Sequence, residues 1–147
     1  MAEQKKTYQK ILAQDIMSDA VDVVKKDMLV HQVAHRMLRE RVSGYPVVDD
    51  YNNLVGMITI TDLLKIIQQA ADNVPDRFAE TIARTKNQPI SSLMAPAVVT
   101  VSLKTTLEEI VRIMLKKNIH TFPVMEHNKL AGIIGRHDVL NAVFVYG

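Results

Sequence analysis

Tyr45-Pro46-Val47-Val48 returns 77 residues later in this chain as Phe122-Pro123-Val124-Met125. The two quartets lie in a longer repeat, because residues 15–48 align with residues 92–125 at this offset without a gap. Further along the chain the alignment continues at an offset of 76, so one residue has been lost in between. The loss falls in a polar stretch, where a turn tolerates a deletion. A repeat of this kind predicts two similar bodies packed about a pseudo-twofold axis.

Within each copy, the apolar residues predict the order strand, helix, strand, strand, helix. The expected strands are 21–24, 45–48 and 54–60 in the first copy and 98–101, 122–125 and 130–134 in the second, with helices from about 30, 61, 107 and 136. Proline cannot donate a hydrogen bond to a ladder, so we expect the strands of Pro46 and Pro123 to be edges or to lie beside a gap. The sequence therefore predicts an α/β (α+β) fold of two β-α-β-β-α units.

The repeat also divides the chain into parts. We expect a flexible N-terminus at 1–10, a first domain at 11–69, a connector at 70–88 and a second domain at 89–147. Phe78 and Ile82 of the connector are spaced like the inner edge of a short helix, so the connector should be partly helical. Two units of about 55 residues would be marginal alone, so they should share an interface.

The composition argues against several classes of protein. No apolar run approaches the about 20 residues that span a bilayer, and the N-terminus leads into no signal-peptide core. We therefore expect a soluble cytoplasmic protein with no membrane partner. The chain has no cysteine, which excludes disulfides and cysteine-based metal sites. A net charge of +2, with four tyrosines, three phenylalanines and no tryptophan, does not make a nucleic-acid-binding surface.

The order of the elements, with Asp15-Ile16-Met17 and Ser92-Leu93-Met94 opening the copies and residues 56–62 closing the first, resembles the cystathionine-β-synthase (CBS) domain. Two such domains in tandem resemble a Bateman module, and the resemblance covers nearly all of the chain except the connector. It implies that adenine-containing ligands, commonly AMP, ADP, ATP or S-adenosylmethionine, bind in clefts between the paired domains. It also implies a homodimer that performs no chemistry and passes a ligand-induced change to an unknown effector protein.

Thr59 and Asp62 give the sharpest local signal. A carboxylate just inside a helix can accept hydrogen bonds from the 2′ and 3′ hydroxyls of a ribose, and a threonine hydroxyl there suits a phosphate. The same Thr-x-x-Asp pattern is close to a capping box, which needs no ligand. The resemblance implies the ribose role for Asp62 and the phosphate role for Thr59, and both roles are compatible with capping.

The second copy keeps Asp138 but has Gly135 where the first has Thr59. A capping partner has little reason to outlast its box, which favours the ribose role that the resemblance implies for Asp138. Loss of the threonine weakens the case for phosphate binding by the second copy, although Arg136 and His137 could compensate as cations. The two copies thus predict one better nucleotide site and one that is altered or empty.

His120 aligns with Ser43, directly before a predicted strand. Related adenylate-sensing modules often carry a basic residue there that reaches the phosphate held by the sister domain. The resemblance therefore implies a first site shared by Thr59, Asp62 and His120. The alternative is a half-buried histidine that is hydrogen-bonded to backbone.

The residues expected around the adenine come from the strands. Thr100 takes the first-strand position that often holds the adenine edge in family members, and the alternative is a β-branched residue with no ligand role. Tyr45, with the adjacent Pro46, and Phe122 would flank the adenine through backbone and ring. The alternative for both rings is a place in the core.

A metal site and an enzyme receive little support. His31 and His35 stand four apart on a predicted helix, but no third ligand completes the set, so we expect no metal site. No recognisable motif indicates catalytic residues, so we expect no enzyme. The alternative to ligand sensing is a structural or dimerisation module with vestigial clefts, which Gly135 and the apolar Val23 favour.

Overall fold

Two three-stranded sheets form the framework of this computed structural model, which describes residues 10–94 and 99–145. The sheet orders are β1 (Val24–Lys25), β2 (Gly44–Val48), β3 (Leu54–Thr59) and β4 (Val101–Ser102), β5 (Thr121–Glu126), β6 (Lys129–Gly135). In each sheet the first pair of strands is parallel and the second is antiparallel. The sheets belong to two compact units, Asp22–Val98 and Met1–Val21 with Val99–Gly147. The expected flexible N-terminus lies outside the described residues except for Lys10.

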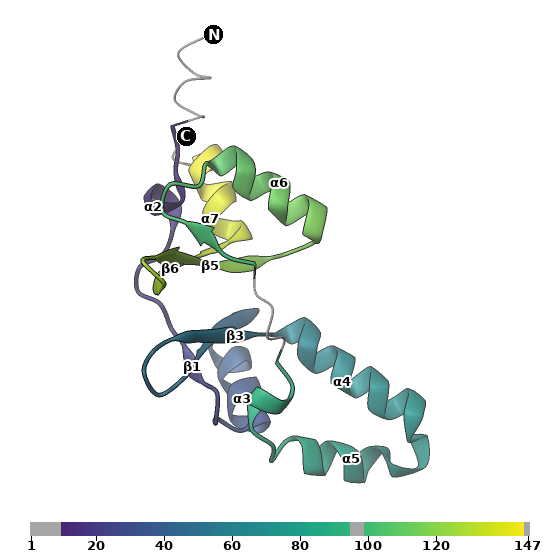
Figure 1. Cartoon of the computed structure of the whole chain (residues 1–147). Coiled ribbons are helices and arrows are strands. Elements are labelled where there is room, and N and C mark those ends of the chain that lie inside the picture. The colour runs from purple at the N-terminus through teal and green to yellow at the C-terminus, as the bar shows by residue number, and fades with distance from the viewer. Residues whose placement is uncertain (1–9, 95–98, 146–147) are drawn as a thin grey trace. The chain divides into compact units, whose positions relative to one another are not determined.

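Each unit also contains helices (Figure 1). The first unit has α3 (Val30–Glu40) and α4 (Ile60–Asn73); the second has α6 (Leu107–Lys117) and α7 (Arg136–Leu140), which continues into the π-helical turn η3 (Asn141–Val145). The order strand, helix, strand, strand, helix is present twice, so the predicted α/β (α+β) fold is confirmed. After α4, the 3-10 turn η1 (Pro75–Arg77) leads to α5 (Phe78–Thr85), which packs against α4.

The first strand of each unit is shorter than predicted and begins later. The expected ranges are 21–24 and 98–101, whereas β1 begins at Val24 and β4 at Val101; Val98 lies outside the described residues. Val24 pairs with Val47, so the residue before Val24 faces Pro46, which has no N–H to donate. Pro123 has the same place beside β4. Of the two alternatives predicted for the proline-containing strands, the structure shows the second: β2 and β5 are middle strands, and the parallel ladder beside each begins only after its proline.

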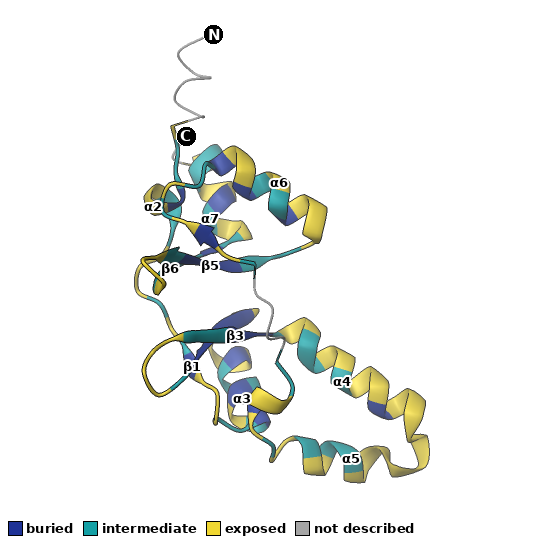
Figure 2. Cartoon of the chain, in the orientation of Figure 1, coloured by how far each residue is buried: buried dark blue, intermediate teal, exposed yellow. Residues whose placement is uncertain are grey.

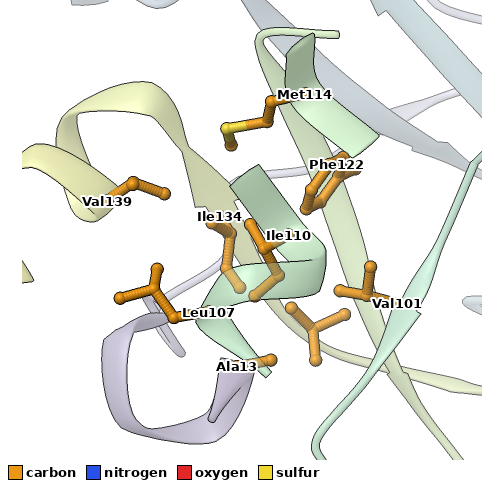
Figure 3. Close-up of a cluster of buried hydrophobic side chains, with 9 residues drawn as sticks. Ala13, Val101, Leu107, Ile110, Met114, Phe122, Ile134 and Val139 are labelled. Atoms are coloured by element: carbon orange, nitrogen blue, oxygen red, sulfur yellow. The ribbon is translucent and has the colours of Figure 1, made fainter. Parts of the chain in front are cut away.

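The apolar spacing that predicts the first helix of each copy also builds the cores. Leu107, Ile110 and Met114 of α6 pack with Phe122 of β5 and Ile134 of β6 (Figure 3). The core of the first unit contains Val24, Val30, Val33, Met37, Tyr45, Val47, Ile58 and Ile90. Burying one large apolar side chain contributes roughly 1.5–3 kcal/mol. The outer faces of the helices are exposed, α4 most extensively (Figure 2).

The segment that leads into each repeat pairs with the other repeat. The helical turn α2 (Ala13–Ile16) adds to the second unit, where the Ala13 N–H donates to the Thr105 carbonyl over 2.8 Å. The 3-10 turn η2 (Ile90–Ser92) adds to the first unit, where the Ile90 N–H donates to the Met28 carbonyl over 2.8 Å. These two bonds are equivalent under the 77-residue offset. The same holds for the bonds Gln14 to Leu103 and Ser91 to Lys26, and for Leu107 to Ile11 and Val30 to Gln88.

The turn between the two antiparallel strands contains the lost residue. In the first unit, Asp49 Oδ1 accepts hydrogen bonds from the N–H groups of Tyr51 and Asn53, both over 2.9 Å. In the second unit, His127 and Asn128 form a tighter turn with φ values of 49° and 64°. Positive φ at both central residues is typical of a two-residue hairpin turn. Across the described residues, no helix is both long enough and apolar enough to cross a bilayer.

Candidate ligand-binding site

Thr59 and Asp62 join the end of β3 to the first turn of α4. The Thr59 N–H and hydroxyl both donate to Asp62 Oδ2, over 2.8 and 3.0 Å, and the Asp62 N–H donates to Thr59 Oγ1 over 3.3 Å. These bonds complete a capping box. Only one carboxylate oxygen takes part, and within the described residues Asp62 Oδ1 accepts no hydrogen bond. Asp62 is half-buried, so Oδ1 remains available to accept from the hydroxyls of a ligand.

Asp138 caps its helix without a threonine. The Gly135 N–H donates to Asp138 Oδ2 over 2.7 Å, which is the bond that the Thr59 N–H makes with Asp62. Contrary to our expectation, the aspartate keeps a capping role where the threonine is absent. Its hydrogen bond is to the backbone N–H of residue 135, which requires no side chain there. Retention of Asp138 thus carries no separate support for a ribose role. Arg136 and His137 lie beside it on exposed positions of α7.

A backbone hydrogen bond ties the residue before the middle strand to the closing helix in both units. The Ile60 N–H donates to the Ser43 carbonyl over 2.9 Å, and the Arg136 N–H donates to the His120 carbonyl over 3.1 Å. His120 is half-buried and lies beside Arg136 at the start of α7. The His120 carbonyl therefore fixes the backbone, while its imidazole makes no hydrogen bond to any residue that the structure describes.

The predicted site residues fall into two groups, one in each unit. The first unit holds Tyr45, Pro46, Thr59 and Asp62, and the second holds Thr100, His120, Phe122, Arg136, His137 and Asp138. Thr100 is exposed directly before β4, and Pro46 is buried in β2. A site shared by Thr59, Asp62 and His120 would join residues of both units, and it stays a prediction.

The rings of Tyr45 and Phe122 lie in the two cores, each only 1% exposed. The Tyr45 hydroxyl donates to Glu40 Oε2 over 2.6 Å. Burial raises the pKa of Tyr45 well above its ordinary value, and the hydrogen bond to Glu40 raises it further. The same bond lowers the pKa of Glu40, with a further contribution from Arg36. Both rings thus have the core positions that the alternative interpretation describes, which leaves the backbone of their strands for a ligand.

A polar network around Arg36 was not anticipated from the sequence. Its guanidinium donates to the Val23 carbonyl over 2.8 Å and to Glu40 Oε1 over 3.1 Å, and lies 3.5 Å from Asp22 Oδ1. The i,i+4 spacing of Arg36 and Glu40 is the sequence signal that could have indicated it. The network is confined to the first copy. The aligned residues of the second copy, Val99, Ile113, Lys117 and Phe122, cannot form it.

His31 and His35 meet edge to face on α3, with ring centroids 6.2 Å apart. In the described part of the chain, no group of three or more His, Cys, Asp or Glu side chains is placed to hold a metal ion. The predicted site residues carry hydroxyl, carboxylate and guanidinium groups, which can form hydrogen bonds with a polar organic ligand.

Comparison with known proteins identifies relatives of both repeats. The model of the CBS domain family matches residues 13–69 and 90–145. CBSX1, a chloroplastic CBS domain-containing protein of Arabidopsis thaliana, is 29% identical over 82% of this chain, which spans only 58% of CBSX1. A crystal structure of CBSX2 in complex with AMP is 28% identical, with a TM-score of 0.73, and the match covers 90% of this chain and 95% of that one.

A third relative extends the comparison to archaea. The crystal structure of MJ1225 from Methanocaldococcus jannaschii is 27% identical, with a TM-score of 0.82, and the match covers 96% of this chain and 50% of that one. The matched part of MJ1225 is therefore about half of a longer chain. Because the family model covers both copies of the repeat, this chain belongs to the CBS domain family and carries two CBS domains.

Proposed function

We propose that this chain is a regulatory module that binds an adenine nucleotide or nucleoside and catalyses no reaction. The observation that carries the proposal is the AMP in the CBSX2 crystal structure, because that chain matches this one over nearly the whole length of both. The candidate ligands are AMP, ADP, ATP and S-adenosylmethionine. Residues of both repeats supply hydrogen-bond partners for such a ligand.

The Thr59 and Asp62 pair is the part of the proposed site with the best-defined geometry. Asp62 Oδ1 accepts hydrogen bonds from the ribose hydroxyls, while Oδ2 keeps its bonds to Thr59. Because the box is formed without a ligand, the carboxylate is already oriented, which reduces the ordering cost of binding. Pro46 and the backbone of β2 flank the adenine in this proposal, and Thr100, directly before β4, holds the adenine edge at the position that Val23 has in the first repeat.

A thermal-shift screen tests the proposal. The protein is titrated with AMP, ADP, ATP, NADH and S-adenosylmethionine, and a nucleoside without a phosphate, adenosine, is included. A ligand that binds only the folded state raises the melting temperature, by an amount that grows with its concentration. A melting temperature unmoved by every compound would refute adenine binding.

The role of His120 needs a separate measurement, because His120 belongs to one unit while Thr59 and Asp62 belong to the other. We propose that its imidazole binds the phosphate of the ligand held by Thr59 and Asp62. His120→Ala should then weaken AMP binding in isothermal titration calorimetry and leave adenosine binding nearly unchanged. Equal losses for AMP and adenosine would show that His120 supports the fold and does not contact phosphate.

Signalling requires a partner, and we propose that ligand binding changes the conformation that an effector protein recognises. The location of this event in the cytoplasm stays a prediction from the sequence. Pull-down experiments with and without the identified nucleotide would test the partner. Capture that is the same in both conditions would contradict ligand-dependent signalling.

A structural or dimerisation module is the second candidate function, and exposed leucines favour it. Leu38 of α3 is 75% exposed and the aligned Leu115 of α6 is 80% exposed. Both leucines lie outside the buried face of their helices. Apolar side chains exposed at matching positions suit burial against a second copy of the chain. Equilibrium sedimentation tests the homodimer, and a tight dimer that binds none of the adenine compounds would favour this function.

A further inference from the structure

A threonine and a glycine have exchanged places between the two repeats. In the first unit Gly44 of β2 pairs with Thr59 of β3, and in the second unit Thr121 of β5 pairs with Gly135 of β6. The alignment places Thr121 on Gly44 and Gly135 on Thr59. Each repeat thus carries one threonine at this cross-strand pair, on opposite strands.

Both pairs belong to the class in which cross-strand side chains lie closest. In an antiparallel ladder, hydrogen-bonded and non-hydrogen-bonded pairs alternate. The hydrogen bonds from Ile60 to Ser43 and from Arg136 to His120 mark hydrogen-bonded pairs. The next pair in each ladder, Gly44 with Thr59 or Thr121 with Gly135, is therefore a non-hydrogen-bonded pair. In this arrangement the side chain of one strand reaches the position of its partner on the other. A hydroxyl can therefore reach the same place from either strand.

Distances around the two glycines support this. A Cβ added to Gly44 would lie 3.1 Å from Thr59 Cγ2 and 3.1 Å from the Ile58 carbonyl oxygen, which is tighter than ordinary contact, so a side chain there would require its neighbours to shift. A Cβ added to Gly135 would lie 3.5 Å from Thr121 Oγ1 and 3.6 Å from Asp138 Oδ2, at ordinary contact distance. The Thr121 hydroxyl and the Asp138 carboxylate therefore both adjoin the place where a side chain of residue 135 would begin.

The two hydroxyls differ in what they already bind. The Thr59 hydroxyl donates to Asp62 Oδ2 and accepts from the Asp62 N–H. The Thr121 hydroxyl makes no hydrogen bond within residues 10–94 and 99–145, and Thr121 is half-buried. Its proton is thus free for a ligand, with the Arg136 guanidinium and the His137 imidazole on the adjoining helical turn.

We propose that Thr121 is a ligand-binding residue of the second repeat, where it takes the role that Thr59 has in the first. Its hydroxyl donates to a phosphate oxygen of an adenine nucleotide whose ribose hydroxyls bind Asp138. This inference rests on the proposed function and assigns the second repeat a nucleotide site of its own. In this proposal the second repeat keeps the hydroxyl, which Thr121 of β5 supplies in place of residue 135 of β6.

Moving the hydroxyl between the strands tests the proposal. Asp62→Ala is introduced first to weaken the first site, and AMP and adenosine binding are then measured by isothermal titration calorimetry. In this background Thr121→Val removes the hydroxyl and keeps the shape, and we expect AMP affinity to fall about 10-fold or more while adenosine affinity hardly changes. Adding Gly135→Ser returns a hydroxyl from the other strand and should recover AMP affinity, whereas adding Gly135→Ala should not. Thr81→Val, at a half-buried threonine of α5 outside the site, is the matched control and should bind AMP normally.

Several results would overturn the inference. Unchanged AMP affinity in Thr121→Val would do so, and so would equal losses for AMP and adenosine, which indicate a structural role. Recovery by both Gly135 variants, or by neither, would refute the supply of this hydroxyl by Thr121. If the wild type binds AMP and Asp62→Ala abolishes all binding, the second repeat has no site, although the proposed function stands. A wild type that binds no adenine compound refutes the proposed function and this inference together.

Discussion

The guanidinium of Arg36 lies over the ring of Tyr45, with its central carbon 4.7 Å from the ring centroid. The same guanidinium donates to the Val23 carbonyl, and Glu40 binds both Arg36 and the Tyr45 hydroxyl. One side chain therefore connects α3 to β2 and to the segment that enters β1. The network holds the chain where Pro46 prevents the ladder from extending.

Replacing Arg36 should destabilise the protein more than replacing a surface arginine. Arg36→Met keeps an aliphatic stem over Tyr45 but loses a charge-assisted hydrogen bond and the cation–π contact, so we expect a loss of about 2 kcal/mol in the free energy of unfolding. Arg112→Met is the control, because Arg112 forms a single exposed i,i+4 pair with Glu108, worth roughly 0.3–0.5 kcal/mol. Urea denaturation measures both, and equal losses would mean that the network adds nothing beyond a surface pair.

Tyr45 should make the protein sensitive to alkaline pH. Its pKa is raised in the folded state, so its stabilising contribution is complete below the ordinary tyrosine pKa, near 10, and is lost as the pH rises from there towards the folded-state value. Tyr45→Phe should cost about 1 kcal/mol at neutral pH, because the bond to Glu40 is lost. The gap in stability between wild type and Tyr45→Phe should then shrink above about pH 10. A gap that stays constant between neutral pH and pH 11 in urea denaturation would contradict this expectation.

Asp62 should show separable effects on stability and binding. Asp62→Ala removes the capping box, at a cost of about 1 kcal/mol in the absence of ligand. It also removes charge-assisted hydrogen bonds to the ribose, which should weaken nucleotide binding by about 10- to 100-fold. Thr59→Ala is the comparison, because it disrupts the box but leaves the carboxylate. Thermal unfolding and calorimetric titration measure the two effects, and nucleotide affinity equal to wild type in Asp62→Ala would refute the ribose role.

The turn α2 packs with the second repeat and the turn η2 with the first, and this exchange predicts which fragment of the chain folds. A fragment of residues 22–94 retains η2 and its hydrogen bonds to Met28 and Lys26, whereas a fragment of residues 11–69 retains the repeat but lacks η2. We expect cooperative thermal unfolding and dispersed amide resonances from the first fragment and not from the second. The opposite result would show that the exchanged turns contribute little to either unit.

Sequence periodicity was enough to predict the strands, helices and repeats, because apolar side chains at fixed spacing also form the cores. It was not enough to place β1, whose start depends on a proline that faces it from a neighbouring strand. Nor could it show that Ala13 and Ile90 pack with the opposite repeat, since local patterns carry no information about long-range partners. Thr59 and Asp62 were predicted as site residues from a local motif, whereas the proposal for Thr121 required the cross-strand register. The alignment shows only that Gly135 lacks the hydroxyl of Thr59, because it compares positions along the chain and does not show that Thr121 lies opposite Gly135 on the neighbouring strand.

The exchange of α2 and η2 between the repeats also relates this chain to a dimer of single repeats. Equivalent hydrogen bonds run in both directions under one offset, from Ala13 to Thr105 and from Ile90 to Met28. Two copies of a chain with a single repeat could form the equivalent bonds by exchanging these segments between them. The present chain holds both partners of the exchange on one polypeptide. The internal repeat therefore has the connectivity of a segment-swapped homodimer within one chain, and one chain allows its two halves to carry different residues at positions such as 44, 59, 121 and 135.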